Sequence, residues 1–255
     1  MIRGRPDDPR RFLIAGDPRA QRVSLEQSVP EPTHPGRSPG KLVITAGPTH
    51  EPIDAVRFIG NRSSGRLGVA LADHAAARGW IVRLLLGPTC LSPSDSRVEV
   101  VRFRTTSELE AALAANAPLC DVLVMAAAVA DYRPKVDPSM LTGKHRRVAG
   151  GMTIELEATP DLLAACSALR SPGQTFVGFA LEQRDQLVSS ARSKLERKSL
   201  DLIVANPLET MDGPTIEAIV LARDGAEHRT PGAISKEQFA PWLMGIIEEH
   251  RHART

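Results

Sequence analysis

Two short segments of the chain combine residue types that bind phosphate groups. The first is a turn of small residues, Thr45-Ala46-Gly47-Pro48-Thr49, where backbone N–H groups can approach a phosphate closely. The second reads NRSSGRLG over residues 61–68 and brings Ser63, Ser64 and Gly65 to the expected start of a helix. Two hydroxyl groups at a helix N-terminus are typical of an N-cap combined with a phosphate cradle. The chemistry indicated is the binding of a nucleotide through its phosphates.

Two basic clusters could supply the matching positive charge. One is the Gly-flanked stretch 143–147 (GKHRR), which contains Lys144, and the other contains Lys194 and Lys198. Those two lysines lie four residues apart on one helical face, where like charges repel and a shared anionic ligand would stabilise them. Arg outnumbers Lys by 26 to 6 in the chain, so lysines in both clusters favour a compact charge for phosphate oxygens.

A third segment, AAAVADYR at residues 126–133, follows an apolar run. Its small residues allow a flat ring or a sugar to come close. Asp131 could accept hydrogen bonds from a base or a ribose, or hold a metal ion. The alternative interpretation is close packing of a helix on a strand, with a solvated Asp–Arg pair.

Nicotinamide and flavin oxidoreductases are the main rival class, and three features disfavour them. The first turn lacks G-x-G-x-x-G, and the second strand ends in LLLGP without an acid for a ribose diol. Tyr132 is the only tyrosine and has Val136 four residues on, so no Tyr-x-x-x-Lys pair exists. A non-catalytic nucleotide-binding protein remains a second alternative.

These residues must be positioned by strands and helices that alternate from Lys41 onward. Hydrophobic periodicity predicts strands at 41–46, 81–86, 98–103, 121–127, 152–157, 175–181 and 201–205. It predicts helices at 64–79, at 106–116 with Thr106 as N-cap, at 160–169 with Pro160 at the first position, at 185–199 and at 235–250. Strands that are apolar throughout favour an α/β fold, a doubly wound, mostly parallel Rossmann-like sheet with ligands at its carboxyl edge. A late β-hairpin, 216–222 with 226–230, indicates either a mixed sheet edge or a small dimerisation subdomain.

Composition sets the remaining limits. Of 255 residues, 1–40 hold seven of the 20 prolines and seven arginines and predict a flexible leader, followed by a single domain at 41–255. That domain holds 25 basic and 25 acidic residues, which disfavours nucleic acid as a partner. No apolar run is long enough to span a membrane, and three scattered cysteines favour a reduced, cytoplasmic protein.

The motifs together resemble one family. The stretches ITAGPTHEPIDAVRFIGNRSSGRLG, AAAVADYRPK, KHRR, TPDLL, VGFALE and KLERKSLDLIVANP, in this order, are similar to those of phosphopantothenoylcysteine synthetases. They resemble in particular the synthetase half of the bifunctional bacterial coenzyme A enzymes, the C-terminal domain of the DNA/pantothenate metabolism flavoproteins.

The resemblance implies a ligase that joins 4′-phosphopantothenate to cysteine through an acyl-cytidylate, using CTP and Mg²⁺ and releasing pyrophosphate and CMP. ATP is the other nucleotide left open. Lys144, Asn61 and Arg57 match the family's catalytic positions, with Arg57 placed one helical turn before Asn61. The implied nucleotide-binding residues, together with those of the phosphate-binding turns, are Gly47, Ser63, Ser64, Gly65, Met125, Ala126, Ala127, Asp131, Lys144, Pro160, Asp161, Leu162, Leu163, Phe179, Lys194 and Lys198.

Some features depart from the family pattern. The family's K-x-K-K loop reads Lys144-His145-Arg146-Arg147 here, and a long spacer makes Lys135 a minor rival for the loop lysine. Residues 1–40 are too short for a flavin-binding decarboxylase half, so no FMN and no decarboxylase activity are expected, and a separate decarboxylase would supply that step. The resemblance also implies a homodimer, for which the late hairpin is a candidate interface.

Overall fold

The central sheet has eight strands in the described part of the chain, in the order β13-β12-β10-β9-β6-β1-β4-β5. The computed structural model describes residues 39–144, 146 and 150–254, so the predicted leader lies outside them except for its last two positions. The strands are β1 (Lys41–Ala46), β4 (Ile81–Leu86), β5 (Glu99–Arg102), β6 (Val122–Met125), β9 (Thr175–Glu182), β10 (Leu202–Pro207), β12 (Ile219–Ala222) and β13 (Glu227–Arg229).

Six of these strands, from β5 to β10, are parallel, and their order reverses between β1 and β6. This reversal is the switch point at which doubly wound sheets bind ligands. The predicted fold class is therefore confirmed. The late hairpin forms the antiparallel pair β12–β13 and extends the sheet, which is the mixed-edge alternative.

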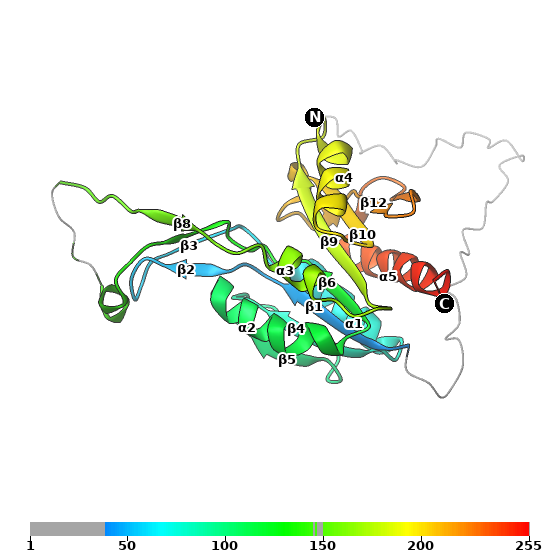
Figure 1. Ribbon diagram of the computed structural model, residues 1–255, viewed down its shortest axis with the longest axis horizontal. Helices are drawn as coiled ribbons and strands as arrows, with labels where there is room; N and C mark the ends of the chain where they lie inside the picture. Colours follow the sequence, from blue (N-terminus) through cyan, green and yellow to red (C-terminus); the bar gives the residue numbers. More distant parts are fainter. Residues whose placement is uncertain (1–38, 145, 147–149, 255) are drawn as a thin grey trace, which may run out of the picture. The chain divides into compact units, whose positions relative to one another are not determined.

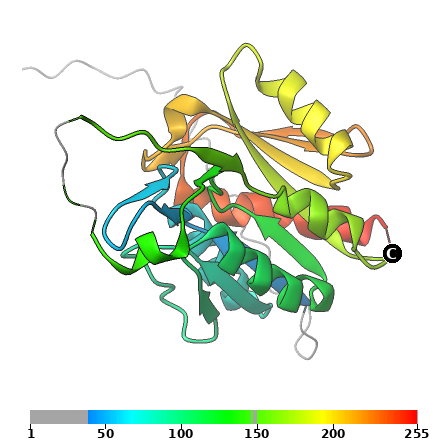
Figure 2. The same ribbon diagram turned by 60° about the vertical axis from the view of Figure 1, so that its left-hand side comes forward.

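Helices cover both faces of the sheet (Figures 1 and 2). They are α1 (Arg66–Ala77), α2 (Thr106–Asn116), α3 (Leu162–Ala168), α4 (Leu187–Arg197) and α5 (Lys236–His252). Successive residues of a strand point to opposite faces, so Leu42 and Ile44 join the core under α1 and α5, whereas Val43 joins the core under α2, α3 and α4. No helix in the described residues combines the length and the apolar character needed to cross a bilayer.

The predicted N-caps of α1 and α2 and the predicted first residue of α3 were wrong, and α4 and α5 begin two residues and one residue later than predicted. The cap of α2 is Thr105, which accepts a hydrogen bond from the Glu108 N–H, because Thr106 is buried against Glu51. Asp161 caps α3 and accepts from the Ala164 N–H, so Pro160 precedes the helix. At α1 the cap position is Gly65 in a left-handed conformation, with no side-chain cap from the serines before it.

Two ribbons, together called the arm, extend from the sheet's carboxyl edge (Figure 1). One pairs β2 (His50–Pro52) with β3 (Phe58–Gly60), and the other pairs β7 (Tyr132–Pro134) with β8 (Leu156–Ala158). The sequence predicted only part of β8, as a longer strand at 152–157. Buried Glu51 fastens the arm to α2, since its Oε1 accepts hydrogen bonds of 2.7 Å from both the N–H and the hydroxyl of Thr106.

The remaining elements are short. They are the 3-10 helices η1 (Ala117–Leu119), η2 (Pro138–Thr142) and η3 (Leu208–Thr210), and the strand pair β11 (Thr215–Ile216) with β14 (Ile234–Ser235). The chain between β10 and β11, including η3, runs past the carboxyl edge of the sheet and forms one wall of the site described next.

Candidate active site

The site lies where β1 and β6 end, and hydrogen bonds tie the two following segments together. The Thr45 hydroxyl accepts from the Ala127 N–H at 3.1 Å, and the Thr49 hydroxyl accepts from the Ala130 N–H at 2.9 Å. Asn61 donates its side-chain amide to the Val129 carbonyl at 2.8 Å. The predicted turn after β1 and the AAAVAD segment are thus held as one rigid edge.

The start of α1 packs against this edge without side chains between them. A Cβ on Gly68 would lie 2.4 Å from the Cβ of Ala46, so any larger residue must push α1 away. Gly47 and Gly65 have φ of +79° and +73°, and a Cβ on Gly65 would lie 3.3 Å from the Gly47 nitrogen. Both glycines therefore let the start of α1 lie directly against the end of β1.

A cavity of about 740 Å³ opens beside this edge, and most of the predicted site residues line it. Its floor comes from β6 and β9 and its far wall from the start of α3 and the end of α4. The predicted residues in its lining are Asn61, Met125, Ala127, Asp131, Pro160, Asp161, Leu162, Leu163, Phe179, Lys194 and Lys198.

Both lysines of this cavity have carboxylate partners. The Lys198 ammonium lies 2.9 Å from Asp161 Oδ1, and Lys194 pairs with Glu182. Burial alone would raise the pKa of the Asp161 and Glu182 carboxyl groups. The hydrogen bonds from the lysines and the other donors outweigh burial, so the pKa of both groups is lower than usual. These two ion pairs offset the repulsion between the lysines, so no shared anion is required to explain their positions. Both side chains still line the cavity, where they can contact a ligand.

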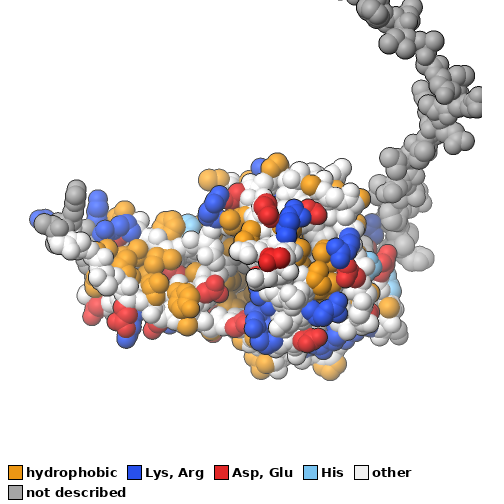
Figure 3. Space-filling view, turned by 90° about the horizontal axis from the view of Figure 1, so that it is seen from above, with side chains coloured by type: hydrophobic (Ala, Val, Ile, Leu, Met, Phe, Trp, Pro, Cys, Tyr) orange, Lys and Arg blue, Asp and Glu red, His pale blue; other side chains and the backbone are white. Residues whose placement is uncertain are grey.

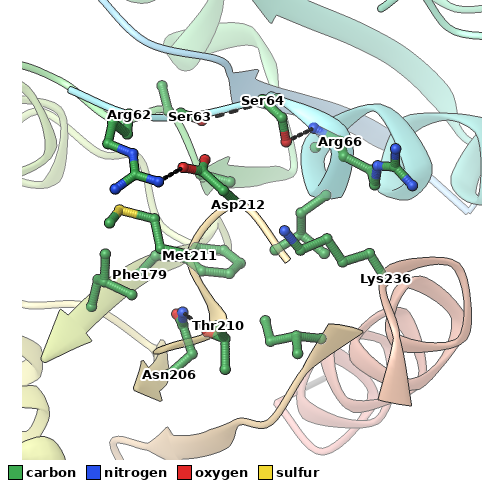
Figure 4. A pocket seen from close by; sticks show the side chains of 18 residues that line it. Arg62, Ser63, Ser64, Arg66, Phe179, Asn206, Thr210, Met211, Asp212 and Lys236 are labelled. Atoms are coloured by element: carbon green, nitrogen blue, oxygen red, sulfur yellow. Dashed lines mark hydrogen bonds and ion pairs between the residues drawn. The ribbon is translucent and has the colours of Figure 1, made fainter. Parts of the chain in front are cut away.

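A second cavity of about 210 Å³ adjoins the first and shares Ala127 and Phe179 with it. The predicted residues Ser63, Ser64, Gly65 and Ala126 lie in its lining. Arg62 and Asp212 form an ion pair of 2.6 Å at its mouth (Figure 4). The Ser63 and Ser64 hydroxyls accept only long hydrogen bonds of 3.4 Å from the N–H groups of Gly65 and Arg66.

Three predicted residues line neither cavity. Gly47 is buried under α1, while Arg57 and Lys144 belong to the arm. Arg57 lies just before β3 and binds the buried carboxylate of Asp54, so the predicted helical turn between Arg57 and Asn61 was wrong and a strand occupies it. The two arm positions are close in the fold because the Ala55 N–H donates to the Gly143 carbonyl at 3.2 Å.

The basic loop is described only in part. Lys144 and Arg146 are exposed, whereas His145 and Arg147 lie outside the described residues. The rival lysine, Lys135, forms an exposed ion pair of 3.1 Å with Glu155 at the base of that loop.

Sequence reasoning missed several residues of the smaller cavity: Arg62, Asn206, Met211, Asp212 and Lys236. The signal for Asn206 was available, because it stands at the carboxyl end of a predicted strand. The burial of Lys236 had no sequence signal, since it depends on how α5 packs beside α1.

No cluster of three or more His, Cys, Asp or Glu side chains able to hold a metal occurs in the described residues. Two exposed carboxylates line the larger cavity, Asp131 and Asp161, and Asp161 is paired with Lys198. This donor set fits a Mg²⁺ ion carried mainly by ligand phosphates, and it does not fit a metal held by the protein alone.

The fold and the site define a class: a doubly wound α/β protein whose cavities, glycine-rich turn and flanking cations suit a phosphorylated ligand at the switch point. Residues 38–250 match the model of the DNA/pantothenate metabolism flavoprotein C-terminal domain. The chain belongs to this family.

Relatives and a solved structure agree with this assignment. The coenzyme A biosynthesis bifunctional protein of Mycobacterium bovis is 44% identical over 199 residues, which cover 73% of this chain and 47% of that protein. A second relative, named cysteine/cysteine sulfinic acid decarboxylase and from an unknown prokaryotic organism, is 46% identical over 169 residues, which cover 66% of this chain and 46% of that protein. The chain therefore spans about half the length of the curated relatives it matches.

A crystal structure of the C-terminal domain of a coenzyme A biosynthesis bifunctional protein superposes with a TM-score of 0.70 at 32% identity. The similarity covers 83% of this chain and 95% of that one. The similarity thus extends over nearly the whole of that domain.

Proposed function

We propose that the chain is a phosphopantothenate–cysteine ligase that activates its carboxylate substrate with CTP. The observation that carries the proposal is the larger cavity, because its lining contains most of the residues that the family pattern assigns to the nucleotide. Family membership over residues 38–250 supports the same substrates, 4′-phosphopantothenate and cysteine.

The reaction has two steps. A carboxylate oxygen of 4′-phosphopantothenate attacks the α-phosphorus of CTP, the bond to the bridging oxygen breaks, and pyrophosphate leaves. The cysteine amine then attacks the acyl carbon, CMP leaves, and an amide forms. Neither step needs a nucleophile from the protein, so the protein contributes positioning and charge neutralisation.

The residues at the cavities suit these tasks. Asp131, Phe179 and the ends of α3 and α4 would bind the base and ribose, and the turn at 63–65 would receive phosphates. Mg²⁺ would accompany the triphosphate as part of the substrate, with Asp131 as the candidate protein ligand. Asn61 would orient the acyl phosphate, since its amide is held at the rigid edge.

The arm supports a homodimer. Val56, Phe58, Tyr132 and Leu156 expose 57, 44, 57 and 44% of their surface on the arm, and Figure 3 shows apolar side chains gathered there. Apolar side chains concentrated on one element are typical of a protein–protein interface. This favours the arm over the late hairpin, whose edge strand β13 reads Glu-His-Arg. The dimer would act in the cytoplasm.

The experiment is product formation by purified protein. With Mg²⁺, 4′-phosphopantothenate and cysteine, CTP should yield phosphopantothenoylcysteine by mass spectrometry, and Lys144→Ala should abolish the product. Lys41→Ala is the matched control, because Lys41 is exposed at the opposite end of β1. Turnover with ATP but not CTP would correct the nucleotide, and no turnover with either would refute the ligase.

A further inference from the structure

Lys236 differs from the other five lysines of the chain, all of which are described. Only 7% of its surface is exposed, whereas the others are exposed or half-buried. It is the first residue of α5, whose start is held by a capping box between Ser235 and Gln238. Figure 4 shows its side chain reaching from α5 into the smaller cavity.

The ammonium group of Lys236 has no ion pair and no hydrogen bond within residues 39–144, 146 and 150–254. The two nearby acids have other partners: Asp212 pairs with Arg62 at 2.6 Å, and Glu237 lies 3.9 Å from Arg66. Burial and the charge of Arg66 lower the pKa of Lys236, although Asp212 and Glu237 act in the opposite direction.

This placement favours a bound anion. The side chain of Lys236 is largely buried, so its ammonium loses part of its hydration without gaining a protein partner, and the N-terminus of α5 adds positive potential around it. Lysine is rare in this chain, where arginine supplies 26 of the 32 basic residues. The position therefore resembles one half of a binding site more than a structural contact.

The opposite wall of the same cavity supplies the other half. Ser63, Ser64 and Gly65 lead into α1, a helix of 12 residues whose N-terminus carries positive potential. Gly68 lets that first turn pack directly on Ala46 at the end of β1. An anion between this wall and Lys236 would belong to a molecule that also fills the adjoining cavity of about 740 Å³, because the two share Ala127 and Phe179.

We propose that Lys236 binds the terminal phosphoryl groups of the nucleoside triphosphate, opposite the Ser63–Gly65 turn. The inference rests on the proposed function, since it assigns the position of that reaction's leaving group. When the bond between the α-phosphorus and the bridging oxygen breaks, negative charge gathers on the pyrophosphate that departs. The Lys236 ammonium neutralises this charge without transferring a proton.

The test compares binding of three probes to the full chain by isothermal titration: inorganic pyrophosphate, CTP and CMP, each with Mg²⁺. Lys236→Met keeps the length of the side chain and removes its charge. It should weaken pyrophosphate and CTP binding by about 10- to 100-fold and leave CMP binding within about twofold. Lys41→Met should leave all three affinities unchanged.

Folding and substrate controls make the result decisive. Lys236→Met should have a Tm at least equal to that of the parent without ligand, because it removes a cation without a protein partner from a largely buried side chain. Lys236→Gln serves as the second variant if Lys236→Met does not fold. An equal loss of CTP and CMP affinity, or no loss, would overturn the assignment.

The acyl substrate is the other source of a phosphoryl group. A selective loss of 4′-phosphopantothenate affinity in Lys236→Met would overturn the nucleotide assignment. The parent protein separates the two proposals: if it forms product while Lys236→Met binds CTP normally, only this inference fails. If the parent neither binds nucleotide nor forms product, the proposed function fails.

Discussion

Gly68→Ala tests whether direct contact between α1 and the end of β1 builds the phosphate-binding turn. The added Cβ would lie 2.4 Å from the Cβ of Ala46, whereas ordinary contacts begin at 3.4 Å. The helix must therefore move away by about 1 Å, and overpacking of this kind costs about 1–3 kcal/mol. Better helix propensity returns about 1 kcal/mol, so we expect a net loss of up to about 2 kcal/mol.

Urea denaturation measures the stability, and titration with CTP measures the site. Because α1 carries the turn at 63–65, its displacement should also weaken CTP binding by about tenfold. Gly245→Ala is the matched control, since a Cβ there meets nothing within 4 Å in the middle of α5. That variant should gain about 0.5–1 kcal/mol and bind CTP as the parent does.

The same substitution to alanine is therefore expected to lower the free energy of unfolding at Gly68 and to raise it at Gly245. If Gly68→Ala gains stability as Gly245→Ala does and keeps its CTP affinity, the close contact is not what positions the turn. A loss of stability with unchanged affinity would separate the helix contact from the binding site and would refute this reasoning equally.

Three further predictions concern other parts of the molecule. Asn61→Asp keeps the shape but cannot donate to the Val129 carbonyl, so product formation should fall by at least about tenfold while the urea midpoint changes little; normal turnover would remove Asn61 from the reaction. Phe58→Asp should convert the dimer to monomer by sedimentation velocity, and an unchanged dimer would exclude this part of the arm as the interface. Asp161→Asn keeps the helix cap but loses the ion pair with Lys198. Because the pKa of Asp161 is lower in the folded state than in the unfolded chain, the ion pair stabilises the fold at neutral pH, and this stabilisation is lost as pH falls below about 4. The variant should be less stable than the parent by under about 1 kcal/mol at pH 7, and a difference in urea midpoint that does not shrink as pH is lowered would contradict the ion-pair explanation.

Much of the fold follows from local patterns because buried parallel strands leave a strong one. The runs KLVITA and IVRLLL are apolar on both faces, and β1 and β4 begin and end where they were predicted. Helix starts were harder. Thr105 and Thr106 are equally good caps by residue type, and only the buried carboxylate of Glu51 decides between them.

The arm could not be predicted in the same way. Its strand β2 reads His-Glu-Pro and β3 reads Phe-Ile-Gly, which are three residues each and contain a strand-breaking residue. Their pairing depends on contacts far apart in the chain, including the Glu51–Thr106 hydrogen bonds. The cavity lining was predicted where motifs follow strand ends, as at Asp131, and missed where packing brings a residue in, as at Lys236.

The central claim, a ligase that works through an acyl-nucleotide, is tested most directly by separating its two steps. The protein is mixed with Mg²⁺, CTP and 4′-phosphopantothenate, and cysteine is added only later. The account predicts one equivalent of pyrophosphate per site before cysteine and CMP release only after it. Pyrophosphate and CMP that appear together only once cysteine is present would contradict an acyl-cytidylate formed in advance, and no pyrophosphate at any stage would contradict the ligase itself.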